Sequence, residues 1–146
     1  MNFKSNIIMT GELTVKKLVG DELISEIHIP NLVVAAGKAH IAKRIGTNTE
    51  DIMTHMGVGS GLAVSAASDL TLATQLDRVE LTSATINAAS VTYTAVFLPG
   101  IASGAITEAG IFNNSVGGTM LCRTTFPVIT KGAGETVAIS WTVTVG

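Results

Sequence analysis

The chain has 146 residues, a length that predicts one domain, or one domain with an arm. Charged residues make up 14% of it, against a usual share of about 25%, while 47% is hydrophobic and the mean hydropathy is +0.48. Since no run of about 18 consecutive apolar residues occurs, a membrane protein is not expected. Low charge is typical of the core of a protein interface, so the composition favours a soluble oligomer or an assembly subunit.

The net charge of −2 argues against nucleic-acid binding. The basic pairs Lys16-Lys17 and Lys43-Arg44 do not extend into the cluster of cations that phosphate binding needs. The single cysteine, Cys122, excludes an intrachain disulfide, and its apolar neighbours predict a small buried side chain. The N-terminus has no long apolar core followed by a cleavage site, so no secretory signal is expected. Neither nucleic acid nor a membrane is therefore expected as a direct partner.

Residues 1–30 are expected to form short strands or an extended arm. Apolar stretches at 7–9 and 13–19 are separated by a polar segment, and the alternation over 23–29 is typical of a strand that ends at Pro30. An arm of this kind could add a strand to the exposed sheet edge of a neighbouring molecule.

One helix is predicted over about residues 32–45, where apolar residues recur at spacings of three and four. Asn31 is a candidate N-cap, Gly46 can end the helix, and Lys43-Arg44 suit the negative end of its dipole. A short second helical turn is allowed around 68–75.

The rest of the chain, within a domain spanning 31–146, predicts a mainly β fold. In the final stretch, 137–145, apolar residues alternate with small polar ones, which places them on opposite faces of a strand. Gly, Pro, Asn and Ser turns separate the expected strands. The predicted strands are 52–58, 76–86, 91–98, 105–112, 119–126 and 137–145. Many short strands favour an antiparallel β-sandwich or jelly roll, a single domain overall.

Sequence patterns for catalysis or for binding a metal or a cofactor are missing. The run 57–61 has no lysine at the place that a phosphate-binding loop requires, and is expected to be a flexible or tightly packed connection. His28, His40 and His55 have no ligand-like spacing and are expected at the surface or in an interface. No acid–base pair or nucleophile motif stands out. We therefore expect a protein that is not an enzyme and that has no cofactor.

Three charged residues lie inside otherwise apolar strands: Arg78, Glu108 and Arg123. A buried charge needs a partner. One hypothesis is therefore that Glu108 forms an ion pair with Arg78 or Arg123, across neighbouring strands or between subunits. The other is that all three side chains face water.

Several segments together resemble a known family. They are Gly57-Val58-Gly59-Ser60-Gly61, Ala67-Ser68-Asp69, Leu76-Asp77-Arg78-Val79, Ile106-Thr107-Glu108-Ala109-Gly110-Ile111-Phe112 and Gly117-Gly118-Thr119-Met120-Leu121-Cys122-Arg123-Thr124. In this order and spacing they resemble small virion proteins of tailed bacteriophages, in which GVGTG, ITEAGLF and GGTMLAR recur before a threonine-rich strand similar to 139–144. The resemblance covers about ninety residues and extends more weakly to 31–37.

The resemblance implies a structural role in the virion with no catalytic residues. Phage capsid cement proteins of similar size have jelly-roll folds and bind as oligomers over the joints between capsomers. The chain has neither coiled-coil heptads nor a repetitive shaft, which favours a cement or decoration protein on the outer capsid surface, made in the host cytoplasm. The expected partners are the major capsid protein and further copies of the chain. The alternatives are a tail-fibre, collar or baseplate component, or a lectin-like module that binds host glycan.

Overall fold

The computed structural model describes residues 8–146, apart from the side chain of Leu32. Residues 1–7, where the first predicted apolar stretch begins, lie outside the described residues. The described chain forms β1 (Met9–Val19), β2 (Glu22–Val33), α1 (Ala35–Gly46), β3 (His55–Gly59), β4 (Gln75–Glu80), β5 (Ser83–Asn87), β6 (Ser90–Phe97), β7 (Gly104–Phe112), β8 (Met120–Lys131) and β9 (Thr136–Val145).

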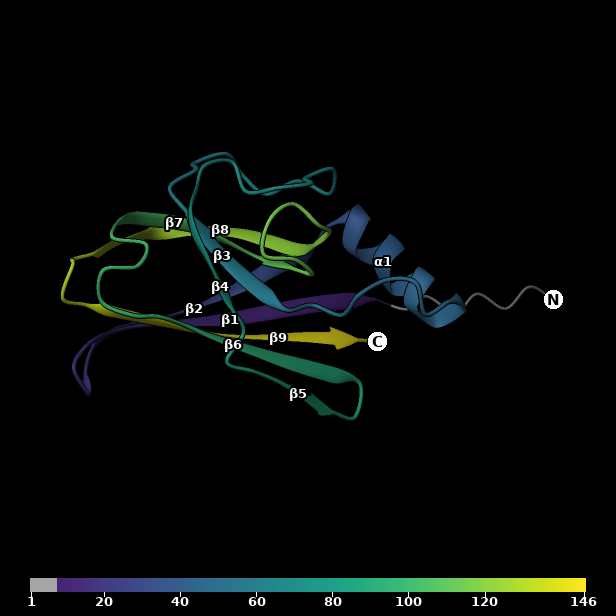
Figure 1. The fold of residues 1–146 in the computed structure, drawn as a ribbon, viewed down its shortest axis with the longest axis horizontal. Coiled ribbons are helices and arrows are strands. Elements are labelled where there is room, and N and C mark those ends of the chain that lie inside the picture. The colour runs from purple at the N-terminus through teal and green to yellow at the C-terminus, as the bar shows by residue number, and fades with distance from the viewer. Residues whose placement is uncertain (1–7) are drawn as a thin grey trace.

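The strands are hydrogen-bonded in the order β4-β3-β7-β8-β2-β1-β9-β6-β5, and every neighbouring pair is antiparallel. Strand β2 belongs to both halves, because it pairs with β1 along most of its length and with β8 at Leu32 and Val33. In Figure 1, β7 and β8 lie in an upper layer, and β1, β9, β6 and β5 in a lower one. The predicted mainly β, antiparallel sandwich with one short helix is confirmed. A jelly roll is not.

The core lies between the two layers. In β9 the alternation predicts the burial, since Val137, Ile139 and Trp141 are fully buried and the residues between them are half-buried. The larger aromatic side chains, Phe97, Phe112, Phe126 and Trp141, are all buried in this core region. Cys122 is buried, as its apolar neighbours predict.

The two N-terminal strands are an integral part of the sheet. Strand β1 pairs with β2 on one side and with β9 on the other, which places it in the middle of the strand order. Leu13 and Val15 of β1 are completely buried in the core. Residues 9–30 therefore form strands and not a detached arm, and no domain boundary separates them from the chain after residue 30.

Several predicted boundaries are wrong, for local reasons. Because β2 continues through Val33, the helix begins only at Ala35, its N-cap is Val34, and Asn31 lies in the strand. Residues 68–75 form no second helical turn. The strand predicted over 76–86 is two strands, because the chain leaves β4, at one end of the strand order, and enters β5, at the other.

Candidate interaction site at the 60–74 loop

The side chain of Glu108, in β7, is completely buried and accepts hydrogen bonds from two directions. Its carboxylate accepts from the backbone N–H groups of Gly61, Ala73 and Thr74, at 3.0, 2.9 and 2.7 Å. From the neighbouring strand β8, Arg123 donates Nε at 3.0 Å, and its Nη2 lies 2.8 Å from the same carboxylate. One carboxylate therefore joins both ends of the connection between β3 and β4, here named the 60–74 loop, to β7 and β8.

The Arg123 guanidinium extends the network into the middle of that loop. Arg123 is 1% exposed, and it donates Nη1 to Asp69 Oδ2 at 2.9 Å and Nη2 to the carbonyl of Ala63 at 2.8 Å. Asp69 in turn accepts the backbone N–H of Ala66 at 2.9 Å. The 60–74 loop contains no helix or strand of its own, so this network supplies the polar contacts that regular structure would otherwise provide.

Electrostatics favour the ionised form of Glu108. Burial raises the pKa of its carboxyl, because a charge is costly away from water. Hydrogen bonds from the N–H groups of Thr74 and Ala73, from Arg123 and from the N–H of Gly61 outweigh that effect and hold the pKa below its ordinary value of 4.5. Glu108 is therefore a buried carboxylate that is ionised and saturated with donors, unlike a general acid, which needs a raised pKa.

The glycines at 57–61 make room for this network. A Cβ atom at Gly59 would collide with the carbonyl oxygen of Thr74 and the carboxylate of Glu108, and one at Gly61 would collide with Ala73 and Glu108. The run is therefore a tightly packed passage out of β3, one of the two alternatives that its sequence allowed.

Of the three charged residues singled out in the sequence, the structure brings together Glu108 and Arg123. Arg78 lies elsewhere. Its guanidinium stacks on the ring of Phe112, 3.5 Å from the centroid, and Nη1 donates to the backbone carbonyls of Asn114 and Gly117. Arg78 thus fixes the turn between β7 and β8 and takes no part in the Glu108 network.

Sequence reasoning missed Asp69 as a member of the network. A signal was present, because Asp69 is the one charged residue in 60–74. The backbone donors Ala73 and Thr74 carry no comparable signal, since any residue supplies an N–H group. Four separate segments of the chain meet here, through Gly61, Asp69, Glu108 and Arg123.

Three large apolar side chains of the 60–74 loop are exposed to solvent. Leu62, Val64 and Leu70 have 82%, 83% and 67% of their surfaces exposed, while Leu72 turns inward and packs on Phe112. Figure 1 shows this loop as the teal segment above β3. Asp69, within the same loop, forms an ion pair with Arg123. The loop therefore presents exposed apolar side chains on a backbone that the buried network holds in place.

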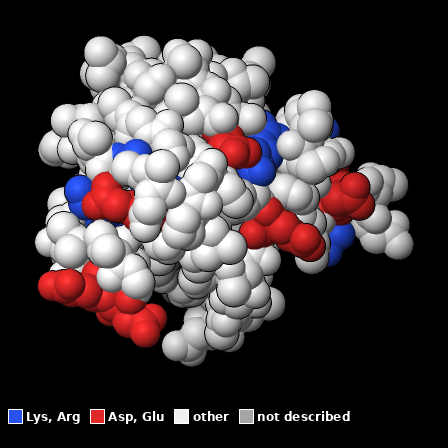
Figure 2. Space-filling model, turned by 60° about the vertical axis from the view of Figure 1, so that its left-hand side comes forward, with Lys and Arg blue, Asp and Glu red and all other residues white. Residues whose placement is uncertain are grey.

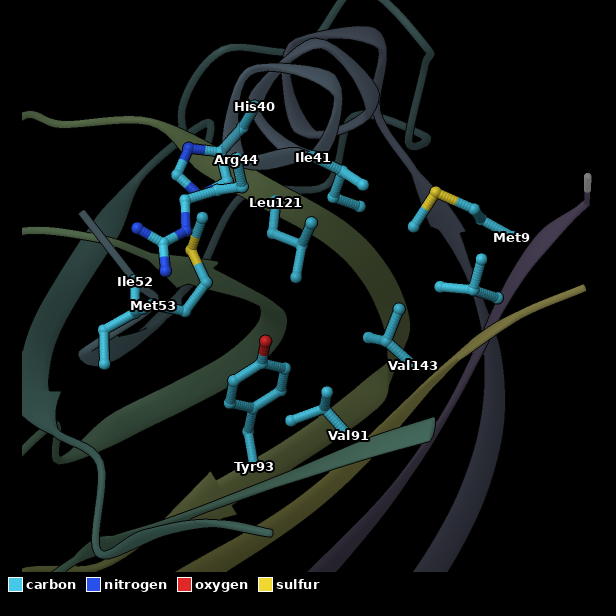
Figure 3. A pocket seen from close by; sticks show the side chains of 11 residues that line it. Met9, His40, Ile41, Arg44, Ile52, Met53, Val91, Tyr93, Leu121 and Val143 are labelled. Atoms are coloured by element: carbon cyan, nitrogen blue, oxygen red, sulfur yellow. The ribbon is translucent and has the colours of Figure 1, made fainter. Parts of the chain in front are cut away.

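A hollow of about 200 Å³ lies at another place in the molecule, between α1 and the lower sheet. Figure 3 shows the Tyr93 hydroxyl pointing into it. Burial, with a smaller contribution from Cys122, raises the pKa of Tyr93 to about 12. His40 is 5% exposed and its Nδ1 lies 3.6 Å from Glu50, so the surface or interface position expected for this histidine is wrong. The walls are mostly aliphatic, which suits an apolar group better than a polar substrate.

Among residues 8–146, no group of three or more histidine, cysteine, aspartate or glutamate side chains could hold a metal ion. No helix in this part of the chain is long and apolar enough to cross a membrane. Comparisons of the chain with protein-family models, with curated proteins and with solved structures found no match.

Proposed function

We propose that the chain is a non-enzymatic structural protein of a tailed-phage virion, a capsid cement protein that binds across neighbouring major capsid subunits. The observation that carries the proposal is the exposed apolar surface of the 60–74 loop, anchored by a buried ion network. The order of sequence motifs supports the virion context. The loop geometry supports binding to another protein.

The physical argument concerns the cost of binding. A mobile loop loses conformational entropy when it docks, which weakens its affinity. The 60–74 loop is already held by Glu108 and Arg123, so its exposed side chains can be buried with little further ordering. Complete burial of a leucine or valine contributes about 1.5–3 kcal/mol. Leu62, Val64 and Leu70 together would contribute about 5 kcal/mol per copy.

Cement function follows from many such contacts. A protein that binds the assembled shell and not the free subunits shifts the equilibrium towards the shell. Copies that bridge neighbouring subunits gain avidity without strong individual contacts. The surface suits this role, because Figure 2 shows a face on which charged side chains occupy a few separate places and the rest is uncharged.

A glycan-binding module is the less favoured alternative. Glycan sites commonly use exposed aromatic platforms, but Trp141, Phe97 and Phe112 are buried in the core. Tyr93 lines the apolar hollow below α1. A tail or baseplate component would use the 60–74 loop in the same way, so the virion location distinguishes it from a cement protein.

The test is occupancy of capsids by variants of the loop. The triple variant Leu62→Ser, Val64→Ser, Leu70→Ser should fold like the wild type, because these side chains are mostly exposed, but should fail to load onto capsids assembled without the protein. Val116→Ser, at an equally exposed site in the turn between β7 and β8, is the matched control and should load normally. Wild-type loading by the triple variant would refute the role of the loop.

A further inference from the structure

Strand β5, Ser83–Asn87, lies at one end of the sheet. It pairs with β6 on one side, and no described strand pairs with its other side. All five of its residues are exposed. The open side of an edge strand presents backbone N–H and C=O groups that another strand can pair with.

The two ends of the sheet differ in how they are protected. Strand β4, at the other end of the order, contains Asp77, Arg78 and Glu80, and charged side chains are a common protection of edge strands against pairing. Strand β5 has no charged residue, and neither does any position from 81 to 107. The edge at β5 therefore lacks the protection that β4 has.

An apolar row leads to this edge. Ile86 is opposite Val91, which is opposite Val143, and the latter two line the hollow below α1. This row belongs to the inner face of the lower sheet, yet Ile86 is 76% exposed. The apolar pattern of the inner face therefore continues onto β5, where no other described part of the chain covers it.

We propose that β5 pairs antiparallel with β5 of a second copy of this chain, about a twofold axis at Thr85. In this register Ala84 of each copy lies opposite Ile86 of the other, so a small side chain faces a large one on the inner face. Ser83 lies opposite Asn87 on the outer face. The strand is therefore complementary to itself in size, and its lack of charge leaves no repulsion between the copies.

The expected dimer is weak. A five-residue ladder is much smaller than a stable interface, which buries about 1,200–2,000 Å². The contact gains importance where many copies are held side by side, because binding to a common surface raises their effective concentration. The inference deepens the proposed assembly role by naming a partner. The test of this dimer uses the purified protein without capsids, so a negative result would not refute capsid binding by the 60–74 loop.

The test uses a charge swap at the twofold axis. Thr85→Lys and Thr85→Glu each place two like charges opposite one another in the dimer. The dimer dissociation constant of each variant, measured by sedimentation equilibrium, should be at least about fivefold higher than that of the wild type. An equimolar mixture of the two variants should recover dimers, now as heterodimers, because the charges are complementary. Thr92→Lys, in the adjacent strand of the same row, is the control and should dimerise like the wild type.

Truncation of the apolar residue gives a second readout. Ile86→Ala should keep the wild-type melting temperature at low protein concentration, because the side chain is mostly exposed in the monomer. The same variant should weaken the dimer about tenfold, because the apolar contact across the axis is lost. A wild-type protein that stays monomeric up to millimolar concentration would overturn the proposal. So would a mixture of the Lys and Glu variants that dimerises no better than either variant alone.

Discussion

Replacing Glu108 by glutamine should destabilise the protein strongly. The amide is close in shape to the carboxylate, but it is neutral and one of its two polar atoms is a donor. It would leave Arg123 with Asp69 as its one remaining counterion and would place N–H groups against the backbone donors of Ala73, Thr74 or Gly61. Loss of one partner of a buried ion pair costs about 3–5 kcal/mol when the other charge is left uncompensated, and because Asp69 still pairs with Arg123 we expect the lower end of that range, about 3 kcal/mol. For a chain of this size the melting temperature should fall by about 10 °C.

The assay is thermal and urea unfolding, with hydrogen exchange to locate the change. The amides of Gly61, Ala73 and Thr74 should exchange faster in the variant, because their acceptor is weakened or lost. Glu12→Gln, at an exposed position in β1, is the matched control and should change neither measurement. A Glu108→Gln variant within 1 °C of the wild type would refute the structural role of the network.

A double variant removes both members of the buried ion pair together. Glu108→Leu with Arg123→Leu removes both charges, and replacement of a buried ion pair by apolar residues is often close to neutral. Here the N–H groups of Gly61, Ala73 and Thr74 would lose their acceptor, and Asp69 and the Ala63 carbonyl would lose their Arg123 donor. Each polar group left buried and unsatisfied costs about 1–3 kcal/mol. We therefore expect the double variant to remain well below the wild type. Wild-type stability would show that the carboxylate does not hold the loop.

Three further predictions concern acid, packing and ionisation. Because the fold lowers the pKa of Glu108 below 4.5, the contribution of its ionised carboxylate to stability is present above about pH 4.5. This contribution is lost as the pH falls through the lower pKa of the folded protein, so the urea midpoint of Glu108→Gln should fall less steeply in acid than that of the wild type. Gly59→Ala should lower the melting temperature, whereas Gly46→Ala, where an added Cβ meets nothing within 4 Å, should leave it unchanged or slightly higher; equal effects would contradict the packing account. Tyr93, the one tyrosine, should ionise near pH 12 in an absorbance titration, and a midpoint near 10 in the folded protein would contradict its burial.

Alternation of apolar and polar residues predicts most of the fold, because a strand with one buried face repeats every two residues. It places β6, β7 and β9 within one residue of their ends. It fails at the start of α1, where Leu32 and Val33 fit both a helix and a strand, and pairing with β8 decides for the strand. It also fails at residues 81–82, where the chain passes from β4 to β5 and no change in hydrophobicity marks the passage.

The candidate site could be predicted in part. Charged residues in apolar strands indicate that Glu108 needs a partner, and the structure provides Arg123 on the adjacent strand. The choice between Arg78 and Arg123 depends on strand order, which local pattern does not specify. The three backbone donors from the 60–74 loop depend on the path of an irregular segment. Such a path is set by its tertiary contacts, so no periodic pattern predicts it.

The central claim is that the chain is a structural part of the virion shell. The most direct measurement is immunogold labelling of intact virions with an antibody against this chain, read by electron microscopy. The account predicts gold distributed over the head. Gold confined to the tail would contradict the cement role in favour of a tail or baseplate component, and virions without any gold would contradict a structural role in the particle.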